Sequence, residues 1–156
     1  MLPVIQRRVL IPAALASALV ACAIALLLVV TAGGQAKTRL APPVVHEHFT
    51  LLPCPKNPRT TLQIEGCAEH RVLSIDRTID ALNAKAFARL GTAGRLAFTR
   101  AAADWLSYRD AECTSEASIY AGGSIQPVAY ANCLVSIDSS HVRELHSALV
   151  ALSPAG

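Results

Sequence analysis

The stretch Trp105-Leu106-Ser107-Tyr108-Arg109-Asp110-Ala111-Glu112-Cys113 constrains the fold more than any other part of the sequence. Trp105, Arg109 and Cys113 are four residues apart, so a helix places them along one face, with Tyr108 beside Trp105. We interpret the two aromatic residues as core residues. Asp110 is the sequence neighbour of Arg109 and points in another direction, so it is not expected to neutralise the arginine.

Arg109 should therefore find its counter-ion elsewhere. A guanidinium keeps its proton, and leaving it unpaired in a partly dry site would cost several kcal/mol. Asp76 is the predicted partner, because it lies at the border of the apolar face of the preceding helix, beside Ile75 and three residues before Ile79. The predicted role of the pair is to set the register of two helices.

Three helices are predicted, over about residues 60–90, 95–120 and 127–152. Each repeats apolar residues at spacings of three and four, as in Ile75, Ile79, Leu82 and Ala86 of the first. Gly91 and Gly94 are expected to bracket the first turn, with Thr92 as a cap. Gly122, Gly123 and Ser124 end the second helix. No segment alternates at period two, so the fold class is all-α: a small three-helix domain without strands.

Four cysteines, Cys54, Cys67, Cys113 and Cys133, lie in this domain. An even number in a chain with an export signal indicates disulfides, and four cysteines allow three connectivities. We favour Cys54 with Cys67 and Cys113 with Cys133, because each pair can close a local loop. No CxxC or CxH spacing occurs, so a zinc site is not expected, nor is any other metal or cofactor.

The N-terminal segment predicts insertion into a membrane. No residue from Val9 to Ala32 is charged, and Arg7-Arg8 precede the apolar run, which indicates a cytoplasmic N-terminus and an extracytoplasmic domain. Three alternatives remain open: an uncleaved transmembrane anchor, a lipoprotein signal in which the lipobox-like Leu19-Val20-Ala21-Cys22 is acylated at Cys22, and a signal cleaved after Val30-Thr31-Ala32. All three place the domain on the bacterial cell envelope, on the periplasmic side of the inner membrane.

The predicted organisation is an anchor or signal at residues 1–32, a linker at 33–50 and the helical domain at 51–156. Gly33-Gly34 and Pro42-Pro43 are typical of a linker. The His46-Glu47-His48 run within it is interpreted as solvated, because a flexible segment gives metal ligands no defined geometry.

The formal charge of the chain is +3, but Arg7 and Arg8 would lie on the other side of the membrane from the domain. Without them, 12 of the 14 Lys+Arg remain against 11 Asp+Glu. So balanced a charge does not favour a nucleic-acid partner.

The pattern around Trp105 resembles the N-terminal domain of the LprI-type lysozyme-inhibitor family, in which a tryptophan precedes Tyr/Phe-Arg-Asp and a cysteine. The resemblance covers about residues 50 to 150. The matching residues are Trp105, Tyr108, Arg109, Asp110, Cys113, Tyr120, Gly122, Gly123, Ser124 and Cys133, with Cys54, Cys67 and Asp76 upstream. One departure is Ile79-Asp80, where the family usually has Leu-Asn; Leu82-Asn83 follows three residues later.

The resemblance implies a helical envelope domain and, in one branch of the family, inhibition of lysozyme, whose cleft holds two carboxylates. The turn from Tyr120 to Pro127 is the predicted projecting element. The near-neutral charge argues against steering towards a basic lysozyme. The alternative is a structural or accessory envelope protein with another partner and no inhibitory activity.

An enzyme is not expected. His70, His141 and His146 are scattered along the sequence. Asp138 and Ser139-Ser140-His141 contain the residue types of a catalytic triad, but adjacency in sequence is not triad geometry.

Overall fold

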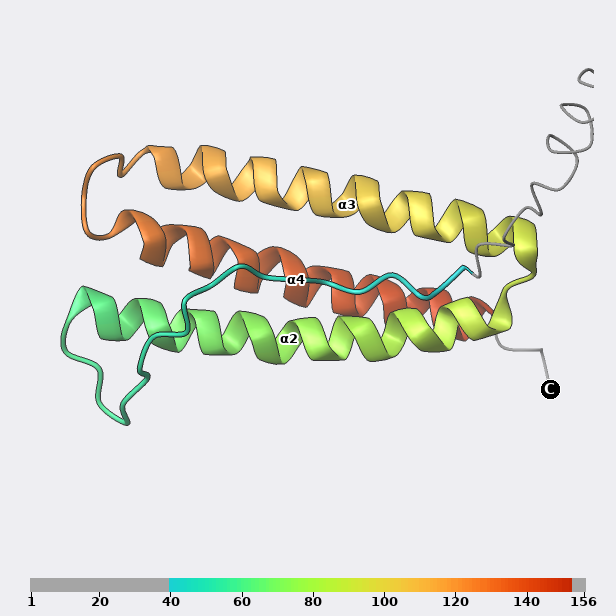
Figure 1. Cartoon of the computed structure of the whole chain (residues 1–156), viewed down its shortest axis with the longest axis horizontal. Helices are drawn as coiled ribbons and strands as arrows, with labels where there is room; N and C mark the ends of the chain where they lie inside the picture. The colour runs from blue at the N-terminus through green and yellow to red at the C-terminus, as the bar shows by residue number, and fades with distance from the viewer. Residues whose placement is uncertain (1–39, 153–156) are drawn as a thin grey trace, which may run out of the picture. The chain divides into compact units, whose positions relative to one another are not determined.

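A computed structural model describes residues 40–152 of the chain. Three long helices, α2 (Thr61–Arg89), α3 (Thr92–Ser118) and α4 (Gln126–Ala151), run side by side and are joined by short turns, as Figure 1 shows. The described residues contain no strand, so the all-α prediction is confirmed for them. No helix between residues 40 and 152 has the length and apolar character needed to cross a membrane. The predicted anchor at residues 1–32, including Cys22, lies outside the described residues.

The helix ends follow local chemistry. The Thr60 hydroxyl accepts a hydrogen bond from the Gln63 amide and caps α2. Helix α3 begins at Thr92, three residues earlier than predicted, because Gly91 serves as its N-cap and Gly94 continues the helix. Thr92 is thus the first helical residue and not the cap. Beyond α3, Gly122 has a φ of +77°, a left-handed conformation that glycine adopts without strain.

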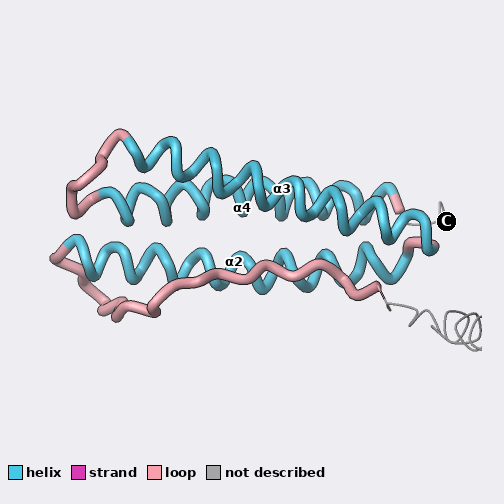
Figure 2. Tube along the Cα trace, turned by 45° about the horizontal axis from the view of Figure 1, so that its top comes forward, coloured by secondary structure: helices cyan, strands magenta, loops and turns pink. Residues whose placement is uncertain are grey.

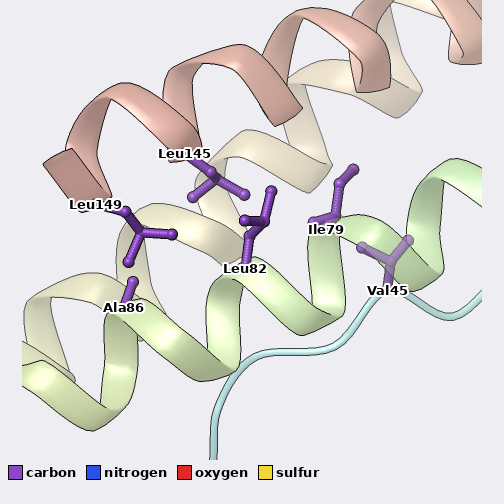
Figure 3. Close-up of a cluster of buried hydrophobic side chains, with 6 residues drawn as sticks. All are labelled: Val45, Ile79, Leu82, Ala86, Leu145 and Leu149. Carbon is purple, nitrogen blue, oxygen red and sulfur yellow. The ribbon is translucent and has the colours of Figure 1, made fainter.

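Helix α4 is the central element, because it packs against both α2 and α3. One hydrophobic cluster, drawn in Figure 3, consists of Val45, Ile79, Leu82, Ala86, Leu145 and Leu149. A second cluster consists of Val72, Cys113, Cys133 and Leu134. The apolar stripes predicted for the first and third helices are therefore largely the observed core, although Ile64 at the start of α2 is 38% exposed.

Both predicted disulfides are present. Cys54 is bonded to Cys67, and Cys113 to Cys133. The first bond ties the segment before α2 to that helix, and the second ties α3 to α4 inside the second hydrophobic cluster. Closing loops of 13 and 20 residues in the unfolded chain stabilises the fold by about 3 kcal/mol for each bond in the chain-entropy model.

Residues 40–50, which we call the strap, form an extended segment that runs along α2 (Figure 2). Val45 is buried in the first cluster, and its amide donates to Asp80 Oδ1 at 2.8 Å. Asn83 Nδ2 donates to the Pro43 carbonyl at 3.3 Å. The prediction of a linker is wrong for this segment, because these contacts attach it to α2, and Glu47 is not solvated as predicted, although His46 and His48 are exposed.

The chain directly after the strap also approaches α2 closely. A Cβ atom at Gly66 would lie 2.7 Å from the Pro53 carbonyl oxygen and 2.9 Å from Leu52 Cβ. Only glycine leaves room for the backbone to pass here, so Gly66 allows this segment to reach Cys54 and the disulfide beyond it.

Candidate functional site

Arg109 is the centre of a buried group of charges. Its side chain is 2% exposed, and its guanidinium nitrogens contact carboxylate oxygens from four segments. The N–O distances are 2.6 Å to Glu47 of the strap, 2.8 Å to Asp110 of α3, 3.5 Å to Asp138 of α4 and 4.0 Å to Asp76 of α2. Burial of Arg109 is confirmed, and so is a contact with Asp76, but Asp76 is the most distant of the four acids. We call these five residues the Arg109 cluster.

The prediction that Asp110 does not neutralise Arg109 is wrong. Arg109 Nε and Nη2 donate to Asp110 Oδ1 at 2.9 and 2.8 Å, so the sequence neighbour does neutralise the arginine. The Asp110 side chain is 53% exposed and reaches the guanidinium from the solvent side. Long side chains can thus meet although their Cα–Cβ vectors diverge.

The acids in the Arg109 cluster outnumber its single cation. Burial, together with repulsion from Asp138 and Glu47, raises the pKa of Asp76 to about 7, although Arg109 lowers it. Burial raises the pKa of Asp138 to about 6 against the attraction of Arg109. The pKa of Arg109 is raised, because its carboxylate partners outweigh the opposing effect of burial. The cluster thus holds protons on carboxyl groups at pH values where exposed aspartates have lost them.

A cleft of about 350 Å³ opens beside this cluster. Arg109, Glu47 and Asp110 lie in it, together with residues from the strap, α2 and α4: His46, His48, Phe49, Glu65, Glu69, Pro127, Tyr130 and Ala131. Burial raises the pKa of Tyr130, and the charges of Asp110 and Glu47 add to that effect. The cleft is therefore lined by charges of both signs, with acids from the strap, α2 and α3 beside Arg109.

The α3–α4 loop, residues 119–125, is the most exposed apolar feature at its end of the domain. Ile119 is 78% exposed, Tyr120 45% and Ile125 40%. Gly122 and Gly123 form its turn, with Ser124 exposed beside them. A hollow of about 310 Å³ between the last turns of α3 and the start of α4 adjoins the cleft, with which it shares Pro127 and Tyr130.

Trp105 and Tyr108, the two aromatic residues predicted to lie in the core, differ in burial. Trp105 packs against the first hydrophobic cluster and stacks on the His141 ring at a centroid distance of 3.8 Å. Burial lowers the pKa of His141. Tyr108 is 58% exposed, so its interpretation as a core residue is wrong. It lines the edge of a hollow between α3 and α4, together with Trp105, Ser140 and His141.

The Asp, Ser and His residues of α4 that match the residue types of a catalytic triad each contact a different partner. Asp138 contacts Arg109, His141 Nδ1 lies 3.2 Å from Glu144 Oε2, and the Ser140 hydroxyl donates to the Ser136 carbonyl. Sequence adjacency in α4 thus does not bring these groups together for catalysis. Within residues 40–152, no three His, Cys, Asp or Glu side chains are grouped so as to hold a metal ion.

Two members of the Arg109 cluster, Glu47 and Asp138, were not predicted. Asp138 lies four residues after Leu134 and seven before Leu145, on the apolar stripe of α4. An acid in that position requires a buried partner, which is a signal that the sequence does contain. Glu47 offers no such signal, because nothing in its neighbourhood repeats with a helical or strand period.

One comparison with known proteins gave a match. The family model described as lysozyme inhibitor LprI matches residues 54–145, from the first disulfide cysteine to the buried Leu145 of α4. No curated protein and no solved structure matches the chain.

Proposed function

The chain belongs to the lysozyme inhibitor LprI family, and from this premise we propose that it is an envelope-anchored binding module that inhibits lysozyme through its α3–α4 loop. The fold fits a binding module, since two disulfides and a buried charge cluster hold the three helices in one arrangement. A rigid scaffold that presents one loop loses little conformational entropy on binding.

The observation that carries the proposal is the exposure of the loop's apolar side chains. The α3–α4 loop lies at the end of the three helices (Figure 1), and its Ile119, Tyr120 and Ile125 are exposed. Exposed apolar side chains gathered in one place mark protein-binding sites, and tyrosine is enriched in such interfaces. A projecting apolar loop is also suited to enter a concave enzyme cleft.

The distribution of charge supports a basic partner. From Asp110 to Val142 the sequence contains no Lys or Arg, while Asp110, Glu112 and Glu116 are exposed on the last turns of α3. The domain is close to neutral as a whole, yet the charged Asp and Glu of the stretch around the loop have no Lys or Arg among them, whereas Lys56, Arg59 and Arg71 lie in and before the first turns of α2. Lysozymes are commonly basic, so the local charge favours the approach of the loop end to such an enzyme.

The proposal is tested by adding the full-length chain, purified in detergent, to a basic lysozyme and following the clearing of a cell-wall suspension. We expect inhibition that saturates with protein concentration. Replacing Ile119 with Ser together with Tyr120→Ala should weaken inhibition about tenfold or more, the usual effect of losing central interface residues. Val150→Ser is the matched control, because Val150 is 76% exposed at the opposite end of α4.

Absence of inhibition at saturating protein would refute the proposal and leave the accessory envelope role as the better account. Equal loss in the loop variant and the Val150 variant would show that the loop is not the contact surface. The envelope location belongs to the same proposal and rests on the uncharged run from Val9 to Ala32 behind Arg7-Arg8.

A further inference from the structure

One end of the domain carries cations and no acids. At this end α2 finishes, α3 begins and α4 finishes, as Figure 1 shows. The two segments that form it, residues 81–103 and 145–152, contain no Asp or Glu. They contain four Lys and Arg residues: Lys85, Arg89, Arg95 and Arg100. We call these two segments the basic end.

Two of the four cations are held in place by backbone carbonyls. Arg89 Nη1 donates to the Leu149 carbonyl at 2.8 Å, which ties the end of α2 to the end of α4. Arg95 Nε donates to the Phe87 carbonyl at 3.0 Å, and its guanidinium lies over the Phe87 ring. A carbonyl does not cancel a formal charge, and a guanidinium keeps its proton, so both side chains keep their positive charge at the basic end.

The other two cations are open to solvent. Lys85 and Arg100 are exposed, and no carboxylate of residues 40–152 lies within ion-pair distance of either. The same end exposes apolar side chains, since Leu96 is 42% and Leu152 39% exposed. Cations together with apolar side chains suit the surface of a bilayer, where lipid phosphates attract the charges and the acyl boundary accepts the leucines.

The strap leads out of the described domain towards the basic end. Its hydrogen bonds advance along α2 as its own residue numbers fall, because Val45 bonds to Asp80 and Pro43 to Asn83. The start of the strap, residue 40, therefore lies towards the end of α2 (cyan in Figure 1).

The chain before the strap is short and basic. Seven residues, 33–39, separate the strap from the uncharged run that ends at Ala32. Seven residues span at most about 25 Å when fully extended. They include Lys37 and Arg39 and no acid. A membrane anchor formed by the uncharged run would therefore keep the basic end, and not the α3–α4 loop, within reach of the bilayer.

We propose that the basic end docks on the anionic phospholipid headgroups of the membrane that anchors the chain. Lys and Arg side chains within a Debye length of an anionic surface are attracted to it. The inference rests on the proposed function for the envelope location and does not depend on lysozyme. Docking by the basic end holds the α3–α4 loop about 40 Å from the bilayer, because the 27 residues of α3 separate the two.

The test compares two lysines of the full-length chain, reconstituted into vesicles of phosphatidylcholine alone or of phosphatidylcholine with phosphatidylglycerol. Lys85 lies in the basic end and Lys56 before the start of α2, and both are exposed. Mass spectrometry follows the acetylation of each amine by a water-soluble reagent. The potential of an anionic bilayer lowers the neutral, reactive fraction of an amine at its surface about threefold. We therefore expect Lys85 to react at least about threefold more slowly relative to Lys56, on the anionic vesicles only.

A matched pair of variants separates docking from mere attachment to the vesicle. Arg100→Glu reverses a charge of the basic end and should remove most of the protection of Lys85. Arg59→Glu makes the same change at an exposed position before α2 and should leave the protection unchanged. High salt, which screens the surface charge, should remove the protection in the wild-type chain as well. Circular dichroism verifies that each variant is folded.

The possible outcomes distinguish this inference from the proposed function. An equal ratio of Lys85 to Lys56 acetylation on both kinds of vesicle, or protection that survives Arg100→Glu and high salt, overturns the inference and leaves inhibition of lysozyme standing. Protection of Lys85 in a chain that does not inhibit lysozyme supports docking and refutes the proposed inhibition. Protection by soluble polyglutamate in detergent, with none on the anionic vesicles, overturns the choice of lipid and indicates an acidic protein partner. A chain that does not float with the vesicles overturns both the inference and the envelope location.

Discussion

Replacing Arg109 with Met tests the Arg109 cluster directly. Methionine fills much of the same volume but leaves Glu47, Asp76 and Asp138 facing one another in a site where their side chains are 7%, 5% and 0% exposed. Removing one partner of a buried ion pair typically costs about 3 to 5 kcal/mol. Domains of this size have total stabilities of about 5 to 15 kcal/mol, so the variant should lose a large part of its stability.

The measurement is thermal unfolding followed by circular dichroism. For a domain of about 100 residues, each kcal/mol shifts Tm by roughly 4 °C or more, so the expected loss is about 12 to 20 °C. Neutralising Asp138 with Asn in the same chain should recover part of it, because sites in contact are coupled by about 0.5 to 3 kcal/mol. Arg143→Met is the control, since Arg143 is exposed and bonds within α4. Additive losses in the double variant, or a loss no greater than that of the control, would refute the reasoning.

Three further predictions concern other parts of the chain. The raised pKa values of Asp76 and Asp138 mean that the folded state holds protons that the unfolded state releases, so stability should fall as pH rises from 5 to 8, by roughly 1 to 3 kcal/mol. In urea titrations, Asp76→Asn should flatten that slope, and an unchanged slope would contradict the assignment. Gly66→Ala should destabilise the domain by about 1 to 3 kcal/mol, because its Cβ would lie 2.7 Å from the Pro53 carbonyl; a neutral effect in the same titration would show that the segment moves away freely. Mass spectrometry of the membrane-extracted chain should show an intact N-terminus, whereas an acylated Cys22 as first residue would establish the lipoprotein alternative.

The helices and disulfides could be predicted because their signals are local. Apolar spacing of three and four residues gave α2 and α4 within a residue of their observed ends, and the cysteine count with short loop lengths gave both bonds. The start of α3 was misplaced, because glycine was interpreted as a helix breaker at residue 94. Glycine lowers helix propensity by only about 1 kcal/mol, which packing of a long helix overcomes.

The strap could not be predicted, because nothing in its own sequence requires it to pack. Its position depends on groups supplied by α2: Asp80 accepts from the Val45 amide, and Asn83 donates to Pro43. Asp80 lies at the half-buried edge of α2, and Asn83 lies on the stripe that contains Ile79 and Ala86, but neither position shows in the sequence which segment it bonds. Long-range polar contacts of this kind have no period, and so the burial of Glu47 was missed.

The strap also determines how the domain can open. Arg109 gathers carboxylates from the strap, α2, α3 and α4, so detaching any one of the four segments breaks at least one ion pair of the Arg109 cluster. Partial opening is then nearly as costly as complete opening, and the four segments should come apart in a single cooperative step. The Val45 amide, held by Asp80, reports on the segment that would otherwise fray first. Its hydrogen should exchange with solvent at the slow rate of the helical core and not at the rate of a terminal segment.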